Sequence, residues 1–581
     1  MALIPLVLTI LLIVPVLAGL IGVVLPSFGY LPWLGFNDIS MAPWRDLFAT
    51  PGLNRSIWLS LQTGLLATAG SLIIVASFLA AFHGTRPFQF ARRCLSPLLS
   101  IPHAAAALGL AFLIAPSGWI MRLVSPDLTG FTRPPDYLIV HDPDGLTMTI
   151  GLITKEIPFL FLMAIAALPQ IRFRREGWIA SSFGYGRVAG WLFAIFPQVY
   201  RQIRLPVFAV LAYAVSVVDV AIILGPTTPP PLAVQLVEWM NDPDLSLRLK
   251  ASAGAVLQLL IAGLAVVIWL VLEWGCAFIG RALLIRGWRF RYDIMARWMA
   301  ASVMFSAMAA IAVGLSLMAV WSLSGPWRFP DIWPSMLSGR VWMTQAGNIE
   351  TAVSATLMIG VPAVLVGIAL VLGTLEARER TNAPRLKNRA GSNIKSENNK
   401  MTGGKQVPWL LMIGLYAPLL VPQVAFLFGL QVYFLKIGVD STLSALVLVH
   451  LVFIMPYMFF SLIEPWKAWD RRYGLVANAL GHGPGAVFWR VRLPMLFRSI
   501  LTAAAVGFAI SASLYLPTLL IGGGRWATIT TEAVALSAGG NRRIIGAYAL
   551  MQMVLPFLGF LVAAILPALL YRNRRGLWVG S

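Results

Sequence analysis

Long apolar runs alternate with short polar segments over almost the whole chain. Each run is close to the roughly 20 residues that an α-helix needs to cross the hydrocarbon of a bilayer. Twelve such runs cover residues 2–25, 58–82, 98–121, 150–170, 206–225, 253–275, 298–322, 350–374, 409–435, 442–464, 500–522 and 545–570. Because lipid offers the backbone no hydrogen-bond partners, each run is expected to be helical. The pattern therefore predicts an all-α, polytopic membrane protein with about 12 transmembrane helices.

Composition supports this fold class. The 581 residues are 59% hydrophobic and 12% charged, and the mean hydropathy is +0.80. Soluble domains carry about a quarter charged residues, so a water-soluble core is excluded. The segment from Met1 to Leu25 lacks a basic start, and its apolar run exceeds the roughly 7–15 residues of a signal peptide. We expect it to be the first membrane span.

The positive charge is concentrated in every second polar segment. If the N-terminus is cytoplasmic, 31 of the 44 Lys and Arg residues fall in inside segments and 13 fall elsewhere. Cytoplasmic loops of membrane proteins carry such an excess. The bias accounts for the net charge of +21 without nucleic-acid binding. It predicts a multi-pass protein of the cell inner membrane with both termini in the cytoplasm.

Few side chains suit catalysis or metal binding. The two cysteines, Cys94 and Cys276, fit neither a disulfide framework nor a metal cluster. The five histidines are scattered, and the chain has no HExxH or GxSxG motif and no paired carboxylates within a span. We expect no metal, no cofactor and no enzymatic activity.

The most polar segment is residues 375–408, which is rich in Asn and Lys and has no apolar periodicity. We expect a mobile cytoplasmic loop. It contains TGGKQ at 402–406, but Gln406 replaces the Ser or Thr of a phosphate-binding loop, and Asn399 stands where its first glycine belongs. We therefore expect no ATP-binding site in this chain.

A weak internal repeat divides the chain into two halves. Gly184 precedes Pro197 by 13 residues, Gly481 precedes Pro494 by 13, and the two glycines are 297 residues apart. Further pairs share this shift: Ala180 with Ala477, Gly186 with Gly483, and Gly225 with Gly522. After a three-residue gap, Gln258 aligns with Gln552. We predict two six-helix repeats, residues 1–285 and 286–581, as in transporters whose halves flank one pathway.

Each copy of the motif predicts a tight reversal between two helices. A short helix, such as 176–183, ends before Gly184 or Gly481, and a glycine there can take the left-handed conformation that reverses the chain. Pro484 suits the first turn of the next helix, where its missing N–H costs nothing. The charge pattern puts both copies, residues 176–200 and 473–495, on the cytoplasmic surface, where such a motif can enter a groove of a partner.

This spacing resembles the EAA loop of ABC-importer permeases, which reads Glu-Ala-Ala, three residues, Gly, nine residues and Ile-x-Leu-Pro. The second copy has Leu475-Val476-Ala477, Gly481 and Val491-Arg492-Leu493-Pro494; the first has Trp178-Ile179-Ala180, Gly184 and Ala194-Ile195-Phe196-Pro197. Neither copy has the glutamate of the motif, since Glu176 lies two residues early. The resemblance extends over most of the chain. With its two copies of the loop, the chain is similar to fused double permeases of the thiamine and ferric iron type.

The resemblance implies a membrane channel that catalyses no covalent chemistry. In the family, a periplasmic solute-binding protein delivers the solute, and an ATPase dimer binds below, with one subunit on each loop. The residues expected to couple this chain to the ATPase are Ala180, Gly184, Gly186, Pro197, Ala477, Gly481, Gly483 and Pro494. With the lipid bilayer, the ATPase and the binding protein are the partners that we expect.

The resemblance favours a thiamine-like or other cationic solute. Asp219 lies inside the fifth apolar run, where an ionisable group is costly and usually faces a cavity or a partner. It either lines a cation pathway or makes a structural hydrogen bond to a neighbouring helix. Leu516 occupies its place in the second repeat, so any role is asymmetric.

Other functions stay open. Relatives that carry ferric iron, polyamines or oxyanions are alternatives within the family. An ion-coupled secondary transporter also has twelve spans in two halves, although it is expected to carry more intramembrane acids. A membrane-embedded enzyme is the least favoured function.

Overall fold

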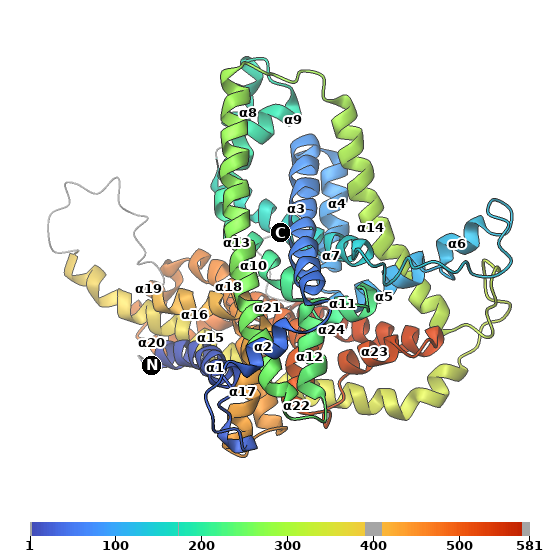
Figure 1. The fold of residues 1–581 in the computed structure, drawn as a ribbon. Coiled ribbons are helices and arrows are strands. Elements are labelled where there is room, and N and C mark those ends of the chain that lie inside the picture. The colour runs from blue at the N-terminus through green and yellow to red at the C-terminus, as the bar shows by residue number, and fades with distance from the viewer. Residues whose placement is uncertain (1–2, 172, 390–408, 572–581) are drawn as a thin grey trace.

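The chain folds into a bundle of helices in the computed structural model, which describes residues 3–171, 173–389 and 409–571 (Figure 1). These residues contain no β-strand, only two isolated bridges, so the expected all-α fold is confirmed. The helices of the first half are α1 (Ile4–Ser27), η1 (Pro32–Leu34), α2 (Ala42–Phe48), α3 (Leu53–Phe82), α4 (Arg86–Leu98), α5 (His103–Ile114), α6 (Trp119–Val124), α7 (Leu146–Ala167), η2 (Leu168–Gln170), α8 (Phe173–Ser182), α9 (Arg187–Gly190), η3 (Trp191–Ile195), α10 (Phe196–Ser216), α11 (Asp219–Leu224), α12 (Leu232–Asn241) and α13 (Leu247–Ile285).

The second half starts after a connection at residues 286–293. Its helices are α14 (Ile294–Ser322), α15 (Arg340–Arg389), α16 (Trp409–Leu420), α17 (Gln423–Lys436), α18 (Leu443–Ala468), α19 (Arg471–Ala479), α20 (Pro484–Val487), η4 (Phe488–Arg492), α21 (Leu493–Ser513), α22 (Leu516–Gly522), α23 (Ile529–Ser537) and α24 (Arg542–Leu570). The helix α15 runs on through residues 375–389, so the start of the segment expected to be a mobile loop is helical. The rest of that segment, residues 390–408, lies outside the described residues.

The structure has fewer membrane-spanning helices than the twelve expected. Among the described residues, ten helices are long and apolar enough to cross a membrane, and α16 with α17, bent by 102°, would make eleven. The expected span 206–225 falls on α10 and α11, which meet at a break. Arg201 and Arg204 occupy the first half of α10, so only its second half is strongly apolar. The polytopic class is confirmed, and the number twelve is not.

Several helices of the two halves begin 297 residues apart. The pairs α7 and α18, α9 and α20, η3 and η4, and α10 and α21 start at Leu146 and Leu443, Arg187 and Pro484, Trp191 and Phe488, and Phe196 and Leu493. This is the shift of the sequence repeat, so the two copies give the same local structure.

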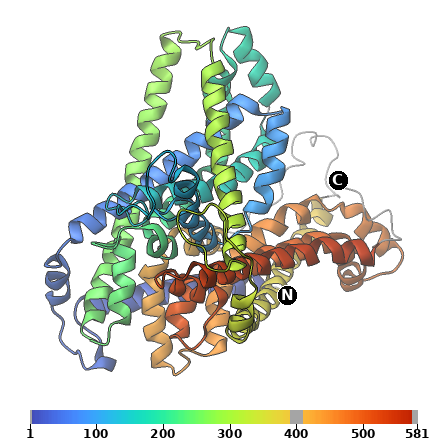
Figure 2. The same cartoon turned by 90° about the vertical axis from the view of Figure 1, so that its right-hand side faces the viewer.

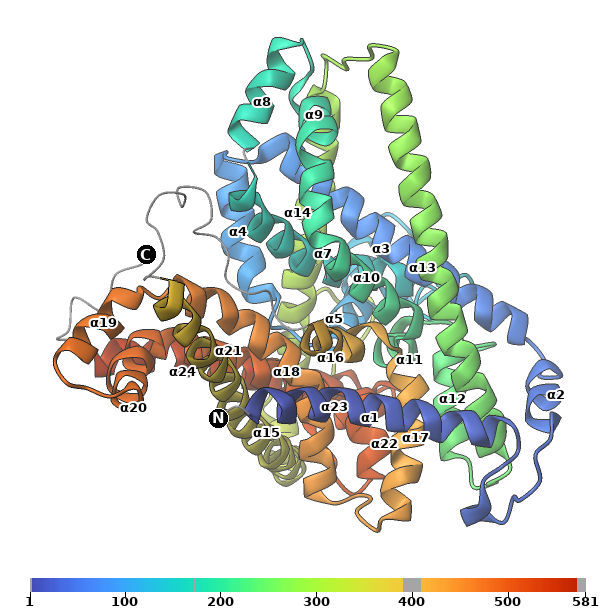
Figure 3. The same ribbon diagram turned by 90° about the vertical axis from the view of Figure 1, so that its left-hand side faces the viewer.

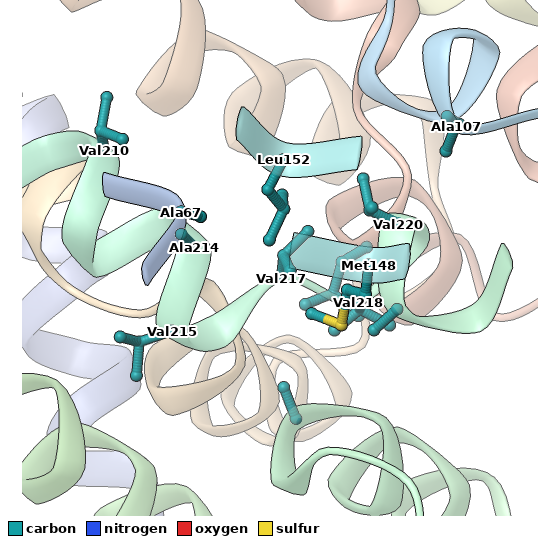
Figure 4. Packing of buried hydrophobic residues seen from close by; sticks show 14 of the residues in the cluster. Ala67, Ala107, Met148, Leu152, Val210, Ala214, Val215, Val217, Val218 and Val220 are labelled. Atoms are coloured by element: carbon teal, nitrogen blue, oxygen red, sulfur yellow. The ribbon is translucent and has the colours of Figure 1, made fainter. Parts of the chain in front are cut away.

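Both halves break one span near its end. The chain leaves α10 at residues 217–218, beside Met148 and Leu152 of α7 (Figure 4), and leaves α21 at 514–515. Gln258 Nε2 donates to the carbonyl of Val215 across 3.1 Å. In the second half, Gln552 Nε2 donates to the Thr530 hydroxyl, which donates to the carbonyl of Ala512. Gln258 thus satisfies a backbone carbonyl next to the first break directly, and Gln552 acts at the second break through Thr530.

Each half packs its first helix against the other half. The helix α1 lies against α17, with α13, α15 and α16 around it (Figure 3), and α14 lies against α5, α24 and α3. Glycines allow these crossings: a Cβ atom on Gly429 would lie 1.9 Å from the carbonyl oxygen of Gly19, and one on Gly314 would lie 2.7 Å from that of Gly109. Such close backbone approach is typical of packed membrane helices. Residues 1–285 and 286–581 therefore share one core.

Candidate functional site

The helix α8 ends in a tight reversal at Gly184. This glycine has φ +80°, the left-handed conformation expected from the sequence. Its N–H donates to the carbonyl of Ser181 (2.9 Å), and the N–H of Tyr185 donates to that of Ala180 (3.2 Å). These two bonds form a Schellman motif, which satisfies the last carbonyls of a helix. We call residues 173–195 the first turn motif.

The second turn motif, residues 471–492, repeats this geometry. Gly481 has φ +83°. Its N–H donates to the carbonyl of Asn478 (3.0 Å), and the N–H of His482 donates to that of Ala477 (3.0 Å). Each donor and acceptor is shifted by 297 residues from its counterpart in the first turn motif. The same backbone device therefore closes both motifs.

Each turn motif is followed by a proline, and the helical turn before that proline is a π-helix, which is wider than an α-helix. Pro197 and Pro494 are the second residues of α10 and α21, and each follows a π-helical turn, η3 or η4. A proline has no N–H for the carbonyl four residues earlier, and its ring clashes with that carbonyl. Those carbonyls belong to Phe193 and Arg490, which lie within η3 and η4. The prolines thus shape the junction between each motif and the next long helix.

The alanines of the motifs are buried inside the protein. Ala180 and Ala477 are 9% and 7% exposed. Ala180 packs toward Gly190, where an added Cβ atom would lie 3.1 Å from its methyl group. The alanines therefore do not form a docking surface; they hold α8 and α19 in place.

Exposed apolar side chains occupy the outer faces of both motifs. Trp178, Phe183, Leu475 and Leu480 are 76%, 62%, 67% and 73% exposed. We define the apolar tips as Trp178, Ile179 and Phe183 in the first turn motif and Leu475, Val476 and Leu480 in the second; every pair is shifted by 297 residues. The sequence analysis did not single out these residues as contacts, although their matched apolar character could have revealed them.

The first turn motif rests against the connection between the two halves, at residues 286–293. Gly186, the N-cap of α9, donates from its N–H to the carbonyl of Arg289 (3.1 Å). The N–H of Val188 donates to Asp293 Oδ2 (2.8 Å), and Arg187 Nη2 donates to the carbonyl of His83 (2.7 Å). Partial burial, with the nearby Arg297, lowers the pKa of Arg187, and Asp293 opposes this change. Figure 2 shows α13 and α14 in green, rising together toward this motif.

The second turn motif has different supports. Arg492, in η4, pairs with Glu376 of α15 (Nη1 to Oε2, 2.6 Å), and both side chains are buried. The guanidinium of Arg492 also lies 4.2 Å from the ring centroid of Trp469. Arg380 pairs with Glu376 (2.7 Å) and donates to the carbonyl of Pro484 (3.3 Å). Gly483, the N-cap of α20, would have nothing within 4 Å of an added Cβ atom.

Comparisons with known proteins identify similar membrane transport proteins. The chain is 29% identical over 542 residues to the inner membrane ABC transporter permease protein YnjC of Escherichia coli strain K12, and the match covers 93% of each chain. The molybdenum transport system permease protein ModB of Mycobacterium bovis and of Mycobacterium tuberculosis is 31% identical over 124 residues, which are 20% of this chain and 47% of ModB. No family model matches the chain.

The similarity supports an ABC transporter permease. The long match and the apolar helices also support a multi-pass protein of the inner membrane. Within such a protein, the turn motifs are candidate contacts to a partner, and ionisable groups inside the spans are candidate contacts to a solute.

Asp219 belongs to a polar cluster in the membrane-spanning part of the protein. It is 8% exposed, and the Tyr213 hydroxyl donates to its Oδ1 across 3.4 Å. Tyr213 lies on α10, six residues earlier, so this hydrogen bond joins the two helices on either side of the break at 217–218. Beside them, His103 Nε2 lies 3.2 Å from Glu156 Oε1, and the rings of His103 and Tyr213 are 4.7 Å apart.

Asp219 is not the only buried acid in the apolar runs of the described residues. Glu156 lies on α7, within the apolar run 150–170, and its side chain is 5% exposed. The adjacent charges of Lys155 and Glu156 in that run were the signal that could have revealed it. Their link to Asp219 runs through His103, on another helix, and no spacing along the chain indicates it.

Proposed function

We propose that this chain is the membrane-spanning permease subunit of a binding-protein-dependent ABC importer. One observation carries the proposal: two turn motifs of the same geometry each present an apolar tip, and all paired positions are shifted by 297 residues. A dimeric motor offers two equivalent grooves, so a permease with two matched projections in one chain suits it. The similarity to an inner membrane ABC transporter permease supports this assignment.

The proposed mechanism transmits movement of the ATPase through the turn motifs. The excess of Lys and Arg in alternate segments favours cytoplasmic termini and a cytoplasmic position for both motifs. In Figures 1 and 3, α8 with α9 stands well apart from α19 with α20. ATP-driven closure of the dimer would bring the motifs together. The π-helical turns η3 and η4 would pass this movement to α10 and α21, which end at the breaks. The chain itself would neither bind ATP nor catalyse a covalent reaction.

We propose a thiamine-like or other cationic solute, delivered by a periplasmic solute-binding protein. The carboxyl groups of Asp219 and Glu156 support a cation, because an anion near them would be repelled. Ferric iron and polyamines are the cationic alternatives. An oxyanion is the third alternative, and ModB, a molybdenum transport permease by name, supports it.

An ion-coupled secondary transporter remains the alternative from another class. The cluster around Asp219 and Glu156 favours it more than the sequence did, since such transporters use intramembrane acids in proton relays. The turn motifs with their apolar tips favour the ABC permease, because a secondary transporter has no cytoplasmic motor to contact.

Uptake into proteoliposomes separates these functions. The chain would be reconstituted with its ATPase and binding protein, and uptake of labelled thiamine, spermidine and molybdate would be measured with ATP or with an imposed proton gradient. We expect ATP-dependent uptake that the double variant Gly184→Val/Gly481→Val abolishes, because valine does not tolerate φ near +80°. Membrane insertion of the variant is checked in parallel. Uptake that follows the proton gradient without ATP would overturn the proposal.

A further inference from the structure

The polar cluster lies where membrane helices are interrupted. His103 is the first residue of α5, directly after Pro102, and Asp219 is the first residue of α11, after the break at 217–218. In the second half, breaks at 421–422 and 514–515 fall inside the apolar runs 409–435 and 500–522. Interrupted helices in transporters usually line the solute pathway, since irregular backbone is tolerated only where protein or water satisfies it.

The two halves supply different chemistry to this place. The first half contributes the ionisable groups of Asp219, Glu156 and His103. The second half has the apolar Leu516 and Phe453 at the matched positions, and its helix α23 packs against α5 and α11. The cluster therefore lies beside the interface between the halves.

Among the described residues, no lysine or arginine forms an ion pair with either carboxyl group. Lys155 is next to Glu156 in the sequence. Its Nζ, however, donates to the carbonyl oxygens of Leu99 and Leu98 at the end of α4, across 3.3 and 3.4 Å. Among the described residues, the ion pair of Glu156 is with His103, and Asp219 forms none. Two buried carboxyl groups beside one imidazole leave negative charge that a bound cation would balance.

An organic cation fits better than a bare metal ion. In the part of the chain that the structure describes, no three His, Cys, Asp or Glu side chains are grouped closely enough to hold a metal. The side chain of His103 is 32% exposed, whereas Glu156 and Asp219 are buried. The phenol ring of Tyr213, whose centroid lies 4.7 Å from that of the His103 ring, can contact an organic cation through its π face.

We propose that Asp219 and Glu156, with His103 and Tyr213, form a binding site for a small organic cation within the translocation pathway. This inference rests on the proposed function and narrows its solute class. The site is one-sided, because Leu516 and Phe453 occupy the positions of Asp219 and Glu156 in the second half.

Equilibrium binding to the purified full chain in nanodiscs tests the site without the ATPase. The probes are labelled thiamine, spermidine and choline, with molybdate as the anionic competitor. We expect at least one cation to bind, and Asp219→Asn and Glu156→Gln each to weaken its binding by about tenfold or more. Asp219→Glu is expected to restore part of the affinity. The control is Glu464→Gln, which removes a carboxylate whose side chain is 72% exposed and should not change binding.

The outcomes separate this inference from the proposed function. Absence of binding for all three cations, binding that the variants leave unchanged, or competition by molybdate as strong as that by cations would each overturn the site. Competition is measured on the unmodified chain, so it decides even if a variant fails to fold. ATP dependence of uptake by the unmodified chain tests the ABC assignment separately, and it can hold while the site fails.

Discussion

Gly186 lies so close to Phe290 that an added Cβ atom would be 2.2 Å from the carbonyl oxygen of Phe290. The matched residue Gly483 has no atom within 4 Å of the same position. The two turn motifs thus have the same backbone but different surroundings: the first is tied to the connection between the halves, and the second to α15.

This difference predicts unequal effects of the same substitution. Gly186→Ala should push the first turn motif away from residues 286–293, at a cost of about 1–3 kcal/mol, and should lower ATP-driven uptake severalfold. Gly483→Ala is the matched control and should behave like the unmodified chain. Uptake and the thermal unfolding midpoint are measured for both. Equal behaviour of the two variants would show that the contact with Phe290 has no mechanical role.

The apolar tips should dominate binding to the ATPase. Phe183→Ser and Leu480→Ser remove exposed side chains, so the unfolding midpoint should stay within about 1 °C, because exposed substitutions are nearly neutral. Affinity for the purified ATPase should fall by tenfold or more for at least one variant, since buried apolar anchors contribute about 2 kcal/mol or more at interfaces. Surface plasmon resonance measures the change. Unaltered affinity in the double variant would assign the docking surface to other residues.

The buried ion pair of Glu376 with Arg492 should be strongly coupled. Glu376→Gln alone leaves the buried Arg492 without its carboxylate partner and should destabilise the protein by about 3–5 kcal/mol, whereas Arg492→Met leaves Glu376 paired with Arg380 and should cost less. The double variant should recover much of this loss, as read from unfolding in detergent. The control pair, Glu464 with Lys467, is exposed, and breaking it should cost about 1 kcal/mol or less. If the losses of unfolding free energy in the two single variants simply add in the double variant, the two side chains are not coupled.

The crossing of α1 and α17 should tolerate no side chain at Gly429. Gly429→Ala places a Cβ atom 1.9 Å from the carbonyl oxygen of Gly19, so the helices must separate. We expect a loss of about 1–3 kcal/mol in unfolding free energy. Gly263→Ala, on α13 with nothing within 4 Å, is the control and should be neutral or stabilising by about 0.5–1 kcal/mol. A destabilised control would point to a general effect of glycine replacement.

Local features of the fold could be predicted from the sequence. The left-handed conformations of Gly184 and Gly481 follow from glycines placed just past short helices, and the apolar runs follow from composition. The helix ending at residue 389 was missed because residues 375–389 look polar and unstructured alone. Glu376 gains its partner Arg492 only in the folded protein, 116 residues later.

In the candidate sites too, local features could be predicted from the sequence, but contacts between distant residues could not. The sequence indicated the positions of the turn motifs but not which side chains face outward, so Ala180 and Ala477 were assigned to docking although they are buried. It indicated Asp219 from a lone charge in an apolar run. The approach of His103 to Glu156 depends on how α5 packs against α7, and no periodicity along the chain encodes this packing.

The packing of the first helix of each half against the other half also constrains how the protein is made. Gly19 on α1 meets Gly429 on α17, roughly 400 residues later, and a ribosome adding about 5–20 residues per second needs tens of seconds for that interval. During this time α1 has inserted into the bilayer, but its main packing surface does not yet exist. Biogenesis must therefore hold an unpaired helix in lipid until the last third of the polypeptide arrives, which makes the nascent chain most vulnerable to quality-control proteolysis before α17 is synthesised.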